Sequence, residues 1–265
     1  MLIAQISDAH CRPQGVLYQG VIDSNARFEA ALAQVAALRP RPDIVLFTGD
    51  LVDEGSGAEY AHARHLLHQL DLPLFVLPGN HDEREAFRSC FADQGYLPAK
   101  GALHYVVPAP GPVRVIALDV TIPGEHHGLF DAAAEAFLEE ALGREPDRPT
   151  LVMMHQPPFS CGVPYVDAYW CEGGERLAAL IARFPAVERL LCGHVHRFMM
   201  RRFGGTIACT APSTTSAIAL AFEEDAQAAS YAEPPAFLLH HWRPGHGMVS
   251  HLLPIGRFPG PYDFG

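Results

Sequence analysis

The sequence predicts an α/β protein in which two mixed β-sheets pack together and helices cover the outside. Through the first 200 residues, short apolar runs typical of strands alternate with segments whose apolar residues recur at helical spacing. After residue 200 the helical signal fades, while strand-like runs continue. Five of the apolar runs lead directly into short polar clusters, and open α/β sheets place their sites at the carboxyl ends of strands.

The elements of the first 200 residues follow in order from this pattern. The expected strands are residues 2–6, 43–48, 74–77, 103–107, 113–119, 150–154 and 187–191. The expected helices are residues 26–38, 59–70, 83–91, 132–142 and 175–184. Ser24 or Asn25 is the candidate N-cap of the first helix because both side chains can accept a hydrogen bond from the first turn. The Pro- and Gly-rich turn at 108–112 predicts that its two flanking strands pair.

The last third of the chain predicts strands at residues 205–210, 237–242 and 248–253, which we expect to form an antiparallel layer. Residues 222–235 are polar, rich in alanine and end in Pro-Pro, so they predict a loop or a mobile hairpin. No internal repeat is evident.

Composition limits the function. A chain of 265 residues with 49% hydrophobic and 18% charged residues is typical of one large globular domain, or of one domain with an appendage. No run approaches the ~18 apolar residues that a membrane span needs, and the first strand leaves no secretory leader, so we expect a cytoplasmic protein without a membrane partner. The net charge of −11 argues against a nucleic-acid polymer as partner.

The six cysteines contain no Cys-x-x-Cys pair, which favours reduced, mostly buried thiols. Cys161 and Cys171 flank a predicted loop and could pair in an oxidised protein. Cys192 precedes a polar cluster, where strand packing explains it better than metal binding.

Five polar clusters carry the chemistry. They are Asp8-Ala9-His10, Gly49-Asp50, Gly79-Asn80-His81-Asp82, His155 and Gly193-His194-Val195-His196. Besides His81 they supply three oxygen donors and four imidazoles, enough to hold two divalent metals. Asp50 is the natural bridge, because one carboxylate can bind two ions ~3.5–4 Å apart. Each cluster alone could be an ordinary turn or a surface histidine, but five in this order are hard to obtain by accident.

These motifs resemble the signature of the binuclear metallophosphoesterases. Within that superfamily the chain is similar to the bacterial class III cyclic-nucleotide phosphodiesterases, and most closely to the glycerophosphodiesterase branch. The similarity extends to residues 18–25, 211–214 and 260–263. It implies a four-layer αββα sandwich with a small C-terminal cap. The expected units are a catalytic core at 1–198, antiparallel strands with a cap or oligomerisation segment at 199–250, and a return to the core at 251–265.

The resemblance implies a ligand set for two divalent ions, which could be iron, manganese, zinc or cobalt. The first metal would be held by Asp8, His10, Asp50 and His196. The second would be held by Asp50, Asn80, His155 and His194. Because His194 and His196 are two residues apart, one can turn toward each ion. No cysteine belongs to the set, which disfavours a structural zinc site.

His81 is expected to act in catalysis and not as a ligand, protonating or stabilising the leaving oxygen above the metals. Asp53 matches the family position that orients this histidine, although a turn residue or an N-cap would also explain it. The candidate substrate contacts are Asn80, His81, His127 and Tyr165, and weaker candidates are Asn25, His126 and Trp170. A solvated histidine pair and aromatic packing at the sandwich edge are the alternatives.

The expected function is hydrolysis of small phosphodiesters by a hydroxide held between two metals. Asp53-Glu54-Gly55 stands where Ser/Thr protein phosphatases carry Asp-Arg-Gly, and position 53 lacks the tyrosine of purple acid phosphatases. Without an arginine clamp, singly charged diesters are favoured over monoesters. The alternatives are a 3′,5′- or 2′,3′-cyclic-nucleotide phosphodiesterase and, in another class, a non-catalytic binding scaffold. The resemblance also implies a homo-oligomer, either a dimer or an assembly of dimers.

Overall fold

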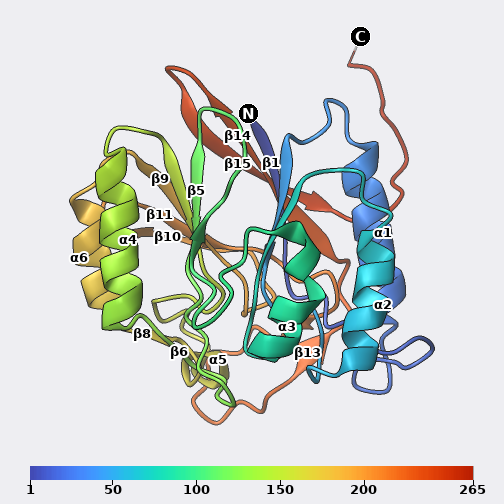
Figure 1. Ribbon diagram of the computed structural model, residues 1–265. Coiled ribbons are helices and arrows are strands. Elements are labelled where there is room, and N and C mark those ends of the chain that lie inside the picture. Colours follow the sequence, from blue (N-terminus) through green and yellow to red (C-terminus); the bar gives the residue numbers. More distant parts are fainter. Residues whose placement is uncertain (265) are drawn as a thin grey trace.

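The computed structural model describes residues 1–264, which fold into two mixed β-sheets packed face to face (Figure 1). The first sheet has the strand order β15-β14-β1-β2-β3. Its strands are β1 (Leu2–Ile6), β2 (Ile44–Thr48), β3 (Leu74–Leu77), β14 (Ala236–Arg243) and β15 (Gly247–Pro254). β1, β2 and β3 run parallel, whereas β14 pairs antiparallel with β1 and β15 pairs antiparallel with β14.

The second sheet has the order β10-β11-β9-β7-β5-β4. Its strands are β4 (Tyr105–Val106), β5 (Arg114–Ala117), β7 (Thr150–Met153), β9 (Val187–Cys192), β10 (Met199–Phe203) and β11 (Thr206–Thr210). The four central strands are parallel, and an antiparallel strand closes each edge. The predicted pairing around the turn at 108–112 is present as the β4–β5 pair.

Helices cover both outer faces, so the predicted four-layer sandwich is confirmed (Figure 1). One outer layer contains α1 (Ser24–Ala37), α2 (Gly57–Leu67) and α3 (Arg84–Cys90), followed by the short η1 (Ala92–Gln94). The other contains α4 (Ala132–Arg144) and α6 (Gly174–Ala182), while α5 (Pro164–Asp167) lies at one end of the sandwich. The predicted N-cap of α1 is wrong. Asp23 is the N-cap, because its carboxylate accepts a hydrogen bond from the Ala26 amide, whereas the Ser24 hydroxyl donates to the carbonyl of His10.

Three apolar layers hold the sandwich together, because each sheet buries both of its faces. Phe28 and Phe47 belong to the layer between α1–α3 and the first sheet, and Leu138 and Leu180 to the layer under α4 and α6. Between the sheets lies a third layer of buried apolar side chains that includes the fully buried Leu46. This middle layer holds the strand ends of both sheets side by side.

The C-terminal third does not form the separate antiparallel layer that the sequence predicts. β11 extends the second sheet, β14 and β15 extend the first, and β10 is a strand that the prediction missed. β12 (Ala217–Ile218) and β13 (Ser230–Tyr231) form a small pair outside the two sheets, as do β6 (Gly128–Leu129) and β8 (Cys171–Glu172). The return to the core reaches Ile255, after which the chain is exposed through Phe264. The division into domains and an oligomerisation role for 199–250 stay predictions.

All six cysteines are free, so the structure contains no pair between Cys161 and Cys171. Within residues 1–264, no helix combines the length and apolarity that a membrane crossing requires.

Candidate metal centre and active site

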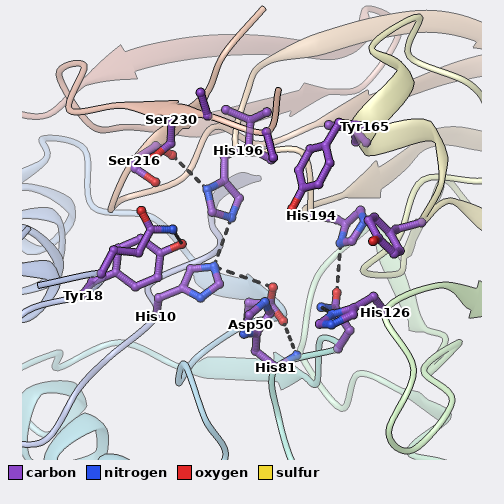
Figure 2. A pocket seen from close by; sticks show the side chains of 17 residues that line it. His10, Tyr18, Asp50, His81, His126, Tyr165, His194, His196, Ser216 and Ser230 are labelled. Carbon is purple, nitrogen blue, oxygen red and sulfur yellow. Dashed lines mark hydrogen bonds and ion pairs between the residues drawn. The ribbon is translucent and has the colours of Figure 1, made fainter. Parts of the chain in front are cut away.

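Two groups of potential metal ligands meet where strands of both sheets end. Their members are Asp8, His10, Asp50 and His196 in one group and Asp50, His155 and His194 in the other. In each group the ligand atoms all lie within 4.8 Å of one another. Figure 2 shows three of the imidazoles pointing into a common space around Asp50. Asn80 borders the second group, since its Oδ1 lies 2.9 Å from His194 Nδ1.

Asp50 is the residue common to both groups. Its Oδ2 lies 3.2 Å from His155 Nε2 and 3.7 Å from His10 Nε2, while its Oδ1 accepts a hydrogen bond from the His81 amide. The carboxylate is 2% exposed and therefore cannot turn away toward solvent. A single fixed carboxylate thus faces both clusters, as a bridging ligand must.

Backbone strain marks the same residues. Asp8, His10, Asp50, His194 and His196 all have positive φ, between 42° and 71°. Non-glycine residues rarely adopt this left-handed conformation, and where they do, the strain is concentrated at functional sites. Five of the seven candidate ligands therefore share this conformation.

Two motif glycines are required by close packing around the ligands. A Cβ on Gly79 would lie 2.1 Å from Asp50 Oδ1, and a Cβ on Gly193 would lie 2.2 Å from Ser7 Oγ and 2.9 Å from Asp8 Oδ2. Any side chain at either position would displace a carboxylate. Glycine at these two positions lets the backbone lie close to the Asp50 and Asp8 carboxylates, a role that a turn dipeptide in the sequence does not reveal.

The electrostatics of the cluster suit bound cations. Burial raises the pKa of Asp8 to about 6. Burial works in the same direction on Asp50, but the imidazole of His155 and its neighbours outweigh it and hold the pKa of Asp50 well below its usual range. Among the described residues, the buried atoms His10 Nδ1 and His155 Nε2 make no hydrogen bond of good geometry, although carboxylate oxygens lie 3.3 and 3.2 Å from them. Unpaired buried polar atoms are costly, and a cation among these donors would satisfy them.

His81 lies beside the two groups, and the main chain of Asp53 holds it. His81 Nδ1 is 2.7 Å from the Asp53 carbonyl oxygen, whereas the Asp53 carboxylate is 3.6 Å away and lies closer to His10 Nδ1, at 3.3 Å. His10, Asp53 and His81 also form a third cluster of ligand atoms. Since a carbonyl can only accept, Nδ1 carries a proton and Nε2 is the nitrogen free to act in the pocket.

A cavity of about 310 Å³ opens over these residues (Figure 2). Among the described residues that line it, none is lysine or arginine. Tyr165 lines it as predicted, and so does His126, whose Nδ1 lies 3.1 Å from the Asn80 amide nitrogen. His127 does not: its imidazole nitrogens lie 3.9 Å from Glu125 and 4.0 Å from Glu172.

Two other candidates lie elsewhere. Trp170 lines a separate cavity, and the Asn25 side chain holds the Arg12 backbone through hydrogen bonds of 3.1 and 3.0 Å. The Arg12 guanidinium is bound by Asp53, Glu54 and Glu59 at 2.8 to 2.9 Å, so it is not free for a substrate.

Some cavity residues had no predicted role. Tyr18, Tyr169, Ser216 and Ser230 line it together with residues from four of the five motifs, the exception being the His155 motif. The four-residue spacing between Tyr165 and Tyr169 was a signal that both could face one side; their rings lie 5.8 Å apart. Ser216 and Ser230 come from the β12–β13 region, which carries no local signal for a site.

The comparison with known families agrees with this geometry, because residues 1–198 match the sequence model of calcineurin-like phosphoesterases. The chain belongs to the calcineurin-like phosphoesterase family. This confirms the metallophosphoesterase resemblance seen in the motifs. A dimetal phosphatase from Danio rerio has the same fold, with a TM-score of 0.67 and 15% identity over 97% of this chain and 99% of that one.

Among the relatives of this calcineurin-like phosphoesterase, the probable glycerophosphodiester phosphodiesterase GpdQ of Arcobacter nitrofigilis is 34% identical, over 100% of this chain and 97% of the relative. GpdQ of Enterobacter lignolyticus is 34% identical over 99% and 94%. The 3′,5′-cyclic adenosine monophosphate phosphodiesterase CpdA of Escherichia coli is 31% identical over 80% and 75%. The chain is a metal-dependent phosphodiesterase of this family.

Proposed function

We propose that this enzyme hydrolyses small, glycerophosphodiester-like phosphodiesters with two divalent metal ions. The observation that carries the proposal is a pair of ligand groups sharing Asp50 beneath a cavity whose described lining includes no lysine or arginine. The full-length similarity to proteins named glycerophosphodiester phosphodiesterases supports the substrate class.

The donor set fits two hard or borderline divalent ions. Carboxylate and amide oxygens combined with imidazoles suit iron, manganese, zinc or cobalt. Asp8, His10, Asp50 and His196 would hold one ion, and Asp50, Asn80, His155 and His194 the other. Two ions held in this way would supply Lewis acidity toward phosphoryl oxygens and would lower the pKa of bound water.

The chain's own residues provide orientation and a proton. The buried Asp50 keeps the two ligand groups at one spacing, and the carbonyl of Thr48 fixes the His155 ring by accepting from its Nδ1 at 2.8 Å. His81 is proposed to donate a proton from Nε2 to the leaving oxygen while the Asp53 carbonyl retains the Nδ1 proton. The Asp53 carboxylate would orient His10 and bind Arg12.

The cavity's lack of free cations favours diesters. A monoester dianion carries one more negative charge than a diester, and arginine or lysine would pair with it strongly, whereas bound metals can neutralise a monoanionic diester. Arg12, the cation beside the motifs, is already paired with Asp53, Glu54 and Glu59. We therefore expect a diester to be used better than its monoester.

A second candidate is a cyclic-nucleotide phosphodiesterase. The edge-to-face rings of Tyr165 and Tyr169 form an aromatic wall against which a base could pack, and Tyr169 also contacts His126. Similarity to CpdA covers less of the chain than similarity to GpdQ does.

The test compares kcat/KM for bis(p-nitrophenyl) phosphate, p-nitrophenyl phosphate, glycerophosphoethanolamine, 3′,5′-cyclic AMP and a single-stranded oligonucleotide at one salt concentration. The protein is stripped with chelator and then loaded with Mn²⁺. The aryl diester should exceed its monoester by about tenfold or more, which is about 1.4 kcal/mol of transition-state binding. A tenfold advantage for the monoester would replace this proposal with a phosphatase, and no metal-dependent activity would leave a binding scaffold.

The proposal includes a cytoplasmic location, supported by six free cysteines, and a homo-oligomeric state, supported by the exposed apolar side chains of Leu220, Phe222 and Tyr231. It includes neither a nucleic-acid polymer nor a membrane as partner.

A further inference from the structure

A chain of hydrogen-bonded side chains crosses the buried face of the first sheet. It runs from Ser250 on β15 through His240 on β14 and Gln5 on β1 to Thr48 on β2 (Figure 1 shows the strands). The three contacts are Ser250 Oγ to His240 Nδ1 at 2.7 Å, His240 Nε2 to Gln5 Oε1 at 3.0 Å, and Gln5 Nε2 to Thr48 Oγ1 at 3.0 Å. Gln5, Thr48 and His240 are fully buried.

The Gln5 side chain also makes a hydrogen bond to the second sheet: its Nε2 donates to the carbonyl of Cys192, at the end of β9, at 3.0 Å. That carbonyl can only accept, so the NH₂ group faces Cys192 and Oε1 faces His240. His240 must then carry its proton on Nε2, and Nδ1 accepts from the Ser250 hydroxyl. Burial lowers the pKa of His240 to about 3, so the ring is neutral. Both amide hydrogens of Gln5 and its oxygen are thereby satisfied.

The two strand ends that Gln5 joins lead directly into the metal-ligand turns. Thr48 precedes Gly49-Asp50 in the first sheet, and Cys192 precedes Gly193-His194 in the second. His155 ties the same two points together, since its Nδ1 lies 2.8 Å from the Thr48 carbonyl and its own carbonyl accepts from the Gly193 amide at 3.0 Å. The Gln5 side chain therefore connects the bases of both ligand groups.

The surroundings of Gln5 explain why this connection matters. The layer between the sheets is mostly apolar, with fully buried side chains such as Leu46, Leu191 and Leu238. Tyr105 and Trp242 also donate hydrogen bonds across it, to the Val76 carbonyl and to Glu188. Hydrophobic burial is non-directional and does not by itself hold one sheet at a set position on the other. Hydrogen bonds have narrow distance and angle ranges, and metal sites require ligand distances correct to about 0.2 Å.

We propose that Gln5, oriented by His240, is a positioning residue that sets the spacing between Asp50 and His194, the ligands contributed by opposite sheets. This inference rests on the proposed two-metal function. Gln5 touches neither substrate nor metal, so its effect is on metal affinity through Thr48 and Cys192.

The test is the substitution Gln5→Met, which has similar volume and no hydrogen-bonding amide, and the double substitution Gln5→Met with His240→Leu. Mn²⁺ binding to the chelator-stripped protein is followed by titration calorimetry, and the melting temperature of the metal-free protein is measured in parallel. We expect Mn²⁺ to bind about 10–100-fold more weakly in both variants, the usual effect of removing a group that orients ligands. The double variant should regain melting temperature relative to Gln5→Met, because removing both polar partners avoids an unpaired buried group.

Two controls separate positioning from general stability. Leu238→Ala removes packing from the same layer, and it should lower the melting temperature while Mn²⁺ affinity stays at the wild-type value. His240→Gln can still donate to Gln5 Oε1 and should keep Mn²⁺ affinity close to wild type.

Wild-type Mn²⁺ affinity in the double variant would overturn the inference and leave Gln5 as an ordinary satisfied polar group, with the proposed function intact. A wild-type protein that binds no Mn²⁺ would instead refute the proposed function itself.

Discussion

Replacing His81 with alanine separates catalysis from metal binding. The His81 side chain is 30% exposed at the cavity wall, and its Nδ1 donates to the Asp53 carbonyl at 2.7 Å. Loss of a general acid typically lowers the rate ~10²–10⁴-fold, equivalent to about 3–5 kcal/mol of transition-state stabilisation. The rate should fall most for substrates with alkoxide leaving groups, which need the proton. It should fall much less for aryl esters, whose aryloxide leaving group departs without one.

The assay measures kcat/KM for glycerophosphoethanolamine and for bis(p-nitrophenyl) phosphate, with metal content determined by elemental analysis. His127→Ala is the matched control, because that histidine is similarly exposed yet lies outside the cavity. Burial lowers the pKa of His81, so the alkyl-ester rate should fall as pH rises through that pKa and the acid form is lost. This pH dependence should be absent from His81→Ala.

Two results would refute the reasoning. Equal losses on alkyl and aryl diesters would mean that His81 positions the phosphate and donates no proton. Loss of a metal ion from His81→Ala would assign His81 to coordination, which the cluster of His10, Asp53 and His81 would permit.

The remaining predictions concern Asp50 and His240. Asp50→Ala should abolish activity and retain at most one metal per chain with an unchanged circular dichroism spectrum, since Asp50 belongs to both ligand groups; two tightly bound metals would contradict the bridging role. In the folded protein the pKa of His240 is about 3, so between that pH and the ordinary value of about 6.5 only the unfolded chain binds the proton. The contribution of His240 to the free energy of unfolding therefore rises with pH by up to about 1.4 kcal/mol per unit, then levels off. Urea unfolding of metal-free wild type and His240→Gln from about pH 5 to 8 should therefore give a stability difference that grows in favour of wild type up to about pH 6.5, and a difference independent of pH would contradict it.

Much of the architecture follows from local sequence. The parallel strands of the first 200 residues, such as β1 and β3, were predicted from short apolar runs that alternate with segments of helical periodicity. Apolar runs of this length have few ways other than a buried strand to remove their side chains from water. The same pattern does not identify strand partners, and this is why the strands of the last third were assigned to one antiparallel layer. In the structure β11 and β14 belong to different sheets, a choice made by long-range packing.

The sequence by itself determined the types of candidate ligand, their order along the chain and the family, because each polar cluster directly follows a strand and its chemistry is local. Only the tertiary structure decided how those residues are used: His126 and not His127 lines the cavity, and the carbonyl of Asp53, more closely than its carboxylate, holds His81. Gln5 reaches Cys192 across 187 positions of the chain. Such contacts depend on how two sheets pack against each other, and no short stretch of sequence encodes that distance.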